Sequence, residues 1–117
     1  MRYDLNGKMF RSVSNTKNGE VSSDTLFHYC QDNDIISANY HGGAIIKGHL
    51  VGKKLHTGQL EFVYHHINQE GHLMIGKCLS TPEFMNDGRL KFLERWQWMT
   101  EDKSEGESEI IEIKNIK

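Results

Sequence analysis

The chain has 117 residues, of which 26% are charged, with a formal net charge of −2 and a pI of about 6.4. This length fits one domain spanning residues 1–117. The slightly acidic balance gives no electrostatic reason to expect nucleic acid or an anionic membrane as a partner. No apolar run approaches the roughly 20 residues of a membrane-spanning helix, and the N-terminus lacks the apolar stretch of a secretory signal, so we expect a cytoplasmic protein.

Short runs rich in β-branched and aromatic residues alternate with glycine-containing turns along the chain, which has eleven glycines and one proline. Because short connections join these runs, we predict an all-β fold, an antiparallel up-and-down meander of about eight strands. Closure into a small barrel would leave no open edge, and a two-sheet β-sandwich is the alternative. No helix is predicted, although a helical turn near residues 81–85 stays open. The predicted strands are 8–14, 24–31, 34–40, 44–52, 59–68, 72–80, 89–99 and 107–115.

Three-residue loops ending in glycine, at residues 41–43, 69–71 and 86–88, fix the register of the predicted hairpins. They place Tyr40 opposite Ala44, and a longer loop places Leu50 opposite Phe62. Because side chains alternate between the two faces of a strand, one face is apolar throughout. The residues predicted to face inward are Phe27, Tyr29, Ile36, Ala38, Tyr40, Ile46, Leu50, Leu60, Phe62, Tyr64, Met74, Cys78, Leu90, Phe92, Trp96 and Trp98. The same register sets His66 against Met74, Phe62 against Cys78, Ser80 against Glu94, Cys78 against Trp96 and Gly76 against Trp98.

The predicted interior also contains polar groups, and this is where a ligand would bind. Burial of an unpartnered carboxylate is costly, so Glu94 is expected to be hydrogen-bonded, protonated or facing a wet cavity. Either Glu94 is a purely structural contact, or it orients a small polar ligand in a lumen lined by aromatic rings. The candidate ligand-binding residues are Tyr40, Tyr64, His66, Glu94, Trp96 and Trp98.

No cofactor or metal site is predicted. The chain has seven histidines, but none of them has the spacing of a zinc site, and His65 and His66 point to opposite faces of a strand. Cys30 and Cys78 form neither a disulfide framework nor a metal-binding pair, and both are expected to be reduced and buried. A His66–Glu94 pair could perform acid–base chemistry, but no nucleophile accompanies it.

The outer face of residues 61–79 departs from the usual alternation, because apolar side chains occupy positions where polar ones were expected. A contiguous exposed apolar patch usually marks an interface. We therefore predict a homodimer through this face, unless the sheet folds over and covers both faces. The candidate interface residues are Val63, Ile67, Leu73, Ile75 and Leu79.

Several stretches resemble a family of small, uncharacterised bacterial proteins of about this length. The matching motifs include 10–15, 25–29, Gly42-Gly43 with Gly48, Gly76 with Cys78, and the run 94–98. Some members of that family carry the label N-acetylglutamate synthase, which would imply a mixed α/β fold with a glycine-containing turn before a helix. Neither is predicted here. The meander also resembles the calycin group of small barrels, including lipocalins and avidin-like proteins, whose lumens hold small ligands.

These observations support three functional hypotheses. The first is a non-enzymatic barrel that binds a small ligand in its lumen. The second is a structural or interaction protein that dimerises through the apolar face. The third is a small enzyme that uses Glu94 and His66.

Overall fold

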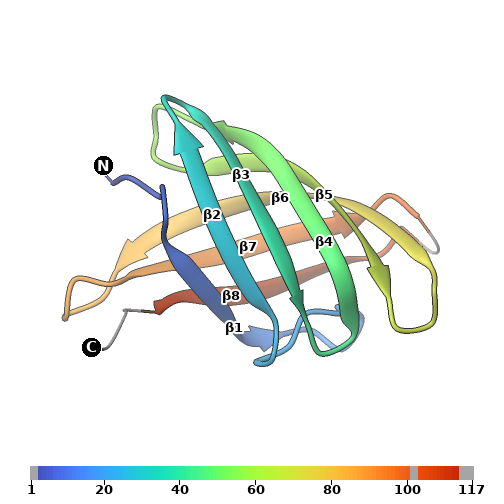
Figure 1. Ribbon diagram of the computed structural model, residues 1–117. Helices are drawn as coiled ribbons and strands as arrows, with labels where there is room; N and C mark the ends of the chain where they lie inside the picture. Colours follow the sequence, from blue (N-terminus) through green and yellow to red (C-terminus); the bar gives the residue numbers. More distant parts are fainter. Residues whose placement is uncertain (1–2, 101–102, 114–117) are drawn as a thin grey trace.

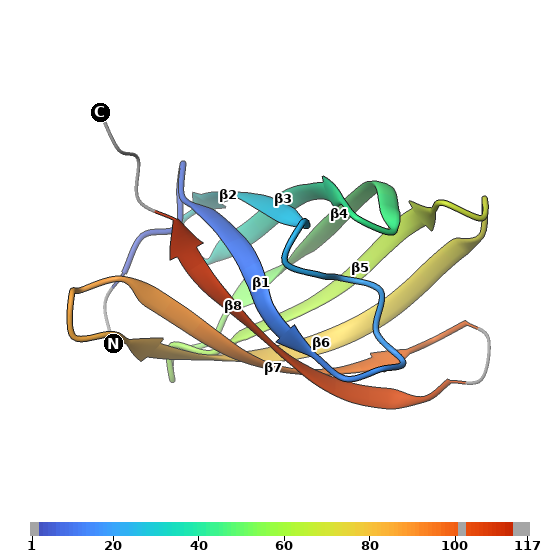
Figure 2. The ribbon, with the colours of Figure 1, turned by 90° about the horizontal axis from the view of Figure 1, so that it is seen from below.

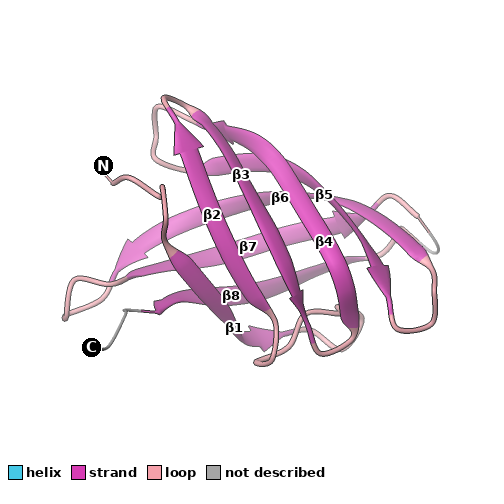
Figure 3. Ribbon diagram, viewed as in Figure 1, coloured by secondary structure: helices cyan, strands magenta, loops and turns pink. Residues whose placement is uncertain are grey.

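Eight antiparallel strands run up and down in sequence order and close into a barrel (Figure 1; Figure 3). The predicted all-β meander and its closure are therefore confirmed. The computed structural model describes residues 3–100 and 103–113, and within them there is no helix of the length and apolarity needed to cross a membrane. The strands are β1 (Met9–Asn15), β2 (Leu26–Asp32), β3 (Ile35–Gly42), β4 (Ile45–Lys54), β5 (Leu60–Asn68), β6 (Leu73–Phe84), β7 (Leu90–Trp98) and β8 (Glu105–Ile113).

The barrel closes where β8 pairs with β1. Met9 lies opposite Ile113, and the ladder continues to Asn15 opposite Ser108, with one irregularity between Ser12 and Ser14. This pairing satisfies the backbone groups that would otherwise form an exposed sheet edge. β8 begins at Glu105, two residues before the predicted start, and the predicted residues 114–115 lie outside the described part of the chain.

No helical turn forms in residues 81–85. Instead, β6 continues to Phe84, and Pro82 pairs with Phe92 of β7. The pairing of β6 with β5 stops at Ser80, so the extension of β6 has only one neighbouring strand. An edge position of this kind tolerates proline, which has no backbone N–H to donate.

The register of β5, β6 and β7 agrees with the sequence prediction. The loops at residues 69–71 and 86–88 have the predicted glycines at positive φ, +82° at Gly71 and +88° at Gly88. The confirmed pairs are His66–Met74, Phe62–Cys78, Ser80–Glu94, Cys78–Trp96 and Gly76–Trp98.

The predicted β3–β4 register is wrong. Tyr40 pairs with Gly48 rather than with Ala44, because a bulge separates this pair from the pair that joins Gly42 and Ile45 at the turn. A bulge adds unpaired residues to a strand, and no simple alternation rule anticipates it.

The bulge also reverses the side-chain orientation at the start of β4. Ile45 is buried, whereas Ile46, which was predicted to face inward, is 52% exposed. Farther along, Leu50 pairs with Tyr64 rather than with Phe62. That shift of two residues keeps every side chain on its predicted face. Of the other residues predicted to face inward, all are buried except Tyr64, which is half-buried against the core.

The connections β1–β2, β3–β4, β5–β6 and β7–β8 lie at one end of the barrel, called here the mouth. Figure 2 shows the β1–β2 connection, residues 16–25, running across this end. At the opposite end, the N-terminal segment packs onto the barrel: Leu5 is fully buried, and Lys54 Nζ donates a hydrogen bond of 3.0 Å to the Tyr3 carbonyl. The N-terminal segment and the β1–β2 connection therefore cover opposite ends of the barrel.

Candidate ligand-binding site

A cavity of about 50 Å³ lies in the lumen beneath the β1–β2 connection. One water molecule needs about 10–15 Å³ on the same measure, so this space holds more than a single water. All six residues predicted as ligand-binding border it, and their role in binding stays a prediction. These residues are Tyr40, Tyr64, His66, Glu94, Trp96 and Trp98.

Glu94, on β7, is buried in the wall of this cavity. Ser80 Oγ donates a hydrogen bond of 2.8 Å to Glu94 Oε2, and Ser108 Oγ donates one of 3.1 Å to Oε1. Burial raises the pKa of Glu94 from 4.5 to about 7, although the two serine hydrogen bonds lower it. Near neutral pH the carboxyl group therefore exists in both protonation states, and it can donate or accept a hydrogen bond.

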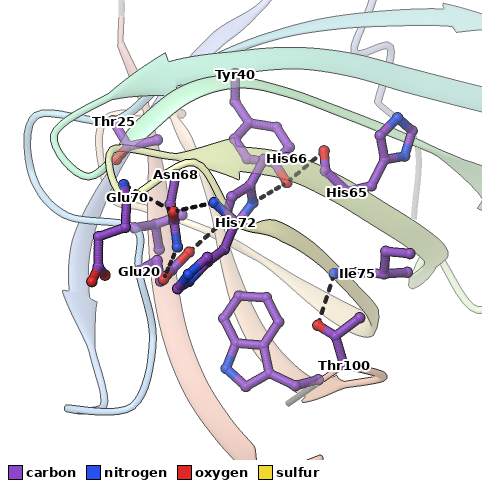
Figure 4. A network of polar contacts seen from close by, with 12 residues as sticks. Glu20, Thr25, Tyr40, His65, His66, Asn68, Glu70, His72, Ile75 and Thr100 are labelled. Atoms are coloured by element: carbon purple, nitrogen blue, oxygen red, sulfur yellow. Dashed lines mark hydrogen bonds and ion pairs between the residues drawn. The ribbon is translucent and has the colours of Figure 1, made fainter.

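A chain of hydrogen bonds runs from Tyr40 through His66 to the mouth (Figure 4). Tyr40 Oη lies 2.9 Å from His66 Nδ1, and His66 Nε2 lies 2.7 Å from Glu20 Oε1. Burial lowers the pKa of His66, and the contact with Glu20 opposes this effect. In the resulting neutral imidazole, Tyr40 donates to Nδ1 and Nε2–H donates to Glu20.

Glu20 was not among the predicted site residues. It lies in the β1–β2 connection, where no strand alternation indicates which way a side chain points. Its other carboxylate oxygen accepts a hydrogen bond of 2.9 Å from Asn68 Nδ2 on β5. Asn15, Gly19 and Val21 from the same part of the chain also border the cavity.

Three aromatic residues of the cavity wall lie directly opposite glycines on the next strand. The pairs are Tyr40–Gly48, Tyr64–Gly76 and Trp96–Gly106. A Cβ atom added at any of the three glycines would lie 2.2–2.4 Å from a ring atom of its partner. The rings therefore lie over backbone that carries no side chain, and this contact fixes their orientation toward the cavity.

Two buried polar atoms have no hydrogen-bond partner in the described residues, namely Asn15 Oδ1 and Tyr29 Oη. Asn15 borders the cavity, and its Nδ2 already donates to the Val21 carbonyl at 3.1 Å. Native structures rarely leave such atoms unpaired. Asn15 Oδ1 is therefore an acceptor available to a water or a ligand in the cavity.

The arrangement does not form a catalytic pair from His66 and Glu94. His66 hydrogen-bonds to Tyr40 and Glu20, whereas Glu94 hydrogen-bonds to Ser80 and Ser108. Cys78 also borders the cavity, but burial raises the pKa of its thiol well above the usual value. It is therefore a neutral thiol and a weak nucleophile. Cys30, predicted to be buried, is exposed. Within residues 3–100 and 103–113, no cluster of three or more potential metal ligands occurs.

The candidate interface residues lie together on the outer faces of β5 and β6. We call this group the apolar strip: Val63, Ile67, Leu73, Ile75 and Leu79, with exposed fractions of 38–70%. Val51 of β4, opposite Val63, extends the strip by one strand. Their role in association stays a prediction.

Comparison with known proteins agrees with this architecture. A family profile described as "Avidin-like protein" matches residues 3–113. Neither the curated proteins nor the solved structures gave a match. The profile covers nearly the whole chain, including all eight strands of the closed barrel, and so the chain belongs to the avidin-like family.

Proposed function

We propose that the barrel binds a small ligand in the cavity at its mouth. The observation that carries this proposal is the cavity wall itself, in which both tryptophans of the chain stand beside buried polar groups with unused hydrogen-bonding capacity. Ligand sites typically combine apolar and aromatic walls with a few polar groups that fix orientation. Membership of the avidin-like family supports the same function.

The wall favours a ligand with a flat or compact apolar part and a polar end. Trp96, Trp98 and Tyr64 offer ring faces and edges, with Trp96 and Trp98 ring centroids 5.5 Å apart. In the cavity wall, the Glu94 carboxyl group accepts a hydrogen bond from the ligand when it is ionised and donates one when it is protonated. The ligand should therefore carry a donor–acceptor group, such as an amide, a urea or a ring N–H beside a carbonyl.

Tryptophan fluorescence tests this function directly, because the chain has only two tryptophans and both line the cavity. Avidin-like proteins bind small ligands such as biotin, so biotin is the first probe, followed by a panel of small cyclic amides and ureas. We expect at least one compound to change the emission saturably and to bind less tightly to Glu94→Ala. A panel without any effect, or a crystal structure with a lumen filled by side chains, would contradict the proposal.

The apolar strip supports a second proposal, that two copies of the chain associate through it. It borders a groove on the outer face of about 1000 Å³. The groove lining includes Val51, Val63 and Leu79 together with three cationic and three anionic side chains, Lys53, Lys77, Arg95, Glu61, Glu105 and Glu107. The cationic and anionic side chains are equal in number. In a dimer with a two-fold axis, the cations of one copy can therefore face the anions of the other copy.

A further inference from the structure

The carboxylate of Glu20 occupies a small receptor built by β5. Each carboxylate oxygen receives one hydrogen bond, Oε1 from His66 Nε2 at 2.7 Å and Oε2 from Asn68 Nδ2 at 2.9 Å (Figure 4). The two donors are two residues apart on one strand, so they point to the same face. Both residues are only 3% exposed while Glu20 is in place, so the carboxylate takes the position that water would otherwise fill.

Contacts that do not involve Glu20 hold both donors in place. Tyr40 Oη binds His66 Nδ1, which leaves the proton on Nε2. Asn68 Oδ1 accepts backbone hydrogen bonds of 3.0 Å from Glu70 N and 2.9 Å from His72 N. The side-chain amide is therefore oriented with its NH₂ group toward the carboxylate. A receptor oriented in this way needs little reorganisation to bind an acceptor.

The group that fills this receptor belongs to a connection rather than to a strand. Apart from Glu20, residues 16–21 are held at the mouth by hydrogen bonds of Thr16 and of the Val21 carbonyl, and by Asn18. Its carbonyl accepts a hydrogen bond of 3.0 Å from Trp98 Nε1, and its Nδ2 donates to Ser104 Oγ and the Glu105 carbonyl, each at 2.9 Å. The donors thus lie on the barrel framework, and the acceptor lies on a loop that can move without breaking a strand ladder.

We propose that His66 and Asn68 form a carboxylate subsite, which Glu20 fills in the ligand-free barrel and which a ligand carboxylate takes over by displacing Glu20. The receptor supplies one donor to each of two oxygens, which matches a planar carboxylate. A tetrahedral oxyanion would bring further oxygens for which the subsite shows no donor. The displaced β1–β2 connection uncovers the mouth, so the same exchange opens the cavity. This inference rests on the proposed ligand binding in the lumen and names the group that one end of that ligand carries.

Rescue by acetate tests the subsite without knowledge of the ligand. Glu20→Ala removes the carboxylate and leaves two buried donors unpaired, so the variant is expected to melt below the wild type. Sodium acetate should then raise the melting temperature of Glu20→Ala saturably, relative to sodium chloride at equal ionic strength. The wild type and Asp24→Ala, which loses an exposed carboxylate of the same connection, should show no such gain.

Three further arms make the test specific. Adding Asn68→Ala to Glu20→Ala should abolish the acetate effect, and sodium phosphate should stabilise Glu20→Ala less than acetate does. If Glu20→Ala does not fold, Glu20→Gln replaces it, and the expected result is an acetate-dependent change of tryptophan emission that is absent in the wild type. An acetate response equal in wild type and variant, or a phosphate response as large as that of acetate, would overturn the carboxylate subsite.

The rescue and the fluorescence screen fail independently. If acetate has no specific effect while a neutral amide still binds in the cavity, the lumen function stands and the carboxylate subsite falls. If acetate rescues Glu20→Ala but no compound of the panel binds, the subsite stands as a local receptor and the exchange with a ligand is overturned.

Discussion

The Tyr64 ring lies across the backbone of Gly76, its partner on β6: a Cβ atom at Gly76 would lie 2.2 Å from Tyr64 Cζ. This contact joins the two strands that carry the apolar strip on their other face. It also sets the position of one wall of the cavity. A residue with a Cβ atom at position 76 would therefore disturb both the Tyr64 ring in the cavity wall and the packing between β5 and β6.

Gly76→Val should displace the Tyr64 ring and disturb the cavity. We expect a loss of about 1–3 kcal/mol of unfolding free energy, typical of an overpacked interior, and a change in tryptophan emission, because Trp98 contacts Tyr64 with ring centroids 5.7 Å apart. Chemical denaturation measures the first effect and fluorescence the second. The double variant Gly76→Val with Tyr64→Ala should recover part of the loss, and an additive loss would show that the ring contact is not the cause.

Glu94 should make the barrel less stable as the pH rises. Its pKa is raised from 4.5 to about 7 in the folded state, so the folded protein holds a proton that the unfolded chain has already lost. This contribution to stability is fully present below about pH 4.5 and is lost as the pH rises through about 7. At about 1.4 kcal/mol per pKa unit it amounts to about 3 kcal/mol.

Glu94→Gln, a mimic of the neutral carboxyl, should remove this pH dependence and be more stable than the wild type at pH 8. Denaturant midpoints between pH 4 and 9 measure the effect. Glu70→Gln, which changes an exposed carboxylate, is the matched control and should follow the wild-type profile. If Glu94→Gln follows the wild-type profile as well, the carboxyl group is already ionised at low pH and the argument from burial is wrong.

His66 should act in the opposite direction. Its folded pKa is lowered below 6.5 by burial, so acid protonates the unfolded chain before the folded one. The stability due to neutral His66 is therefore present above about pH 6.5 and is lost as the pH falls below it. In the Glu94→Gln background, where the opposing effect is absent, unfolding free energy should decrease on acidification from pH 7 to 5. Adding His66→Gln should flatten that decrease.

Ile75 occupies the middle of the apolar strip and is 46% exposed. If two copies associate there, Ile75→Glu would bury a carboxylate against an apolar surface and shift the protein from dimer to monomer. Sedimentation velocity at several protein concentrations measures the mass. Val13→Glu, which places the same charge at a 43%-exposed apolar position on β1, should leave the mass unchanged. A monomeric wild type would remove the second proposal.

The sequence predicted most of the fold because alternation and glycine turns act locally. In β5, β6 and β7 the turns are short and regular, so placing Met85 opposite Arg89 was enough to bring Ser80 to Glu94 several residues later. The same reasoning failed at β3–β4, where a bulge changed which of Ile45 and Ile46 faces the core.

The cavity wall was predicted more completely than the mouth. Tyr40, Tyr64 and Glu94 could be assigned to the lumen because each lies within a strand of alternating side chains. Glu20 could not, because its position depends on how the β1–β2 connection folds over the barrel end. That path is set by long-range contacts such as Trp98 Nε1 to the Asn18 carbonyl, and no local pattern in the sequence encodes them.

The pairing of β1 has a consequence for the order of folding. All ladders except β1–β8 join strands that are neighbours in the chain. The seven strands from β2 to β8 can therefore form as successive hairpins with short loops. β1 pairs with β8 from Met9 to Asn15, but its pairing with β2 covers only Met9 to Arg11. We therefore expect β1 to dock late, when β8 is in place, and to show the earliest hydrogen exchange among the strands. Residues 16–25 follow β1 directly, so the docking of β1 that closes the barrel also places the β1–β2 connection over the cavity.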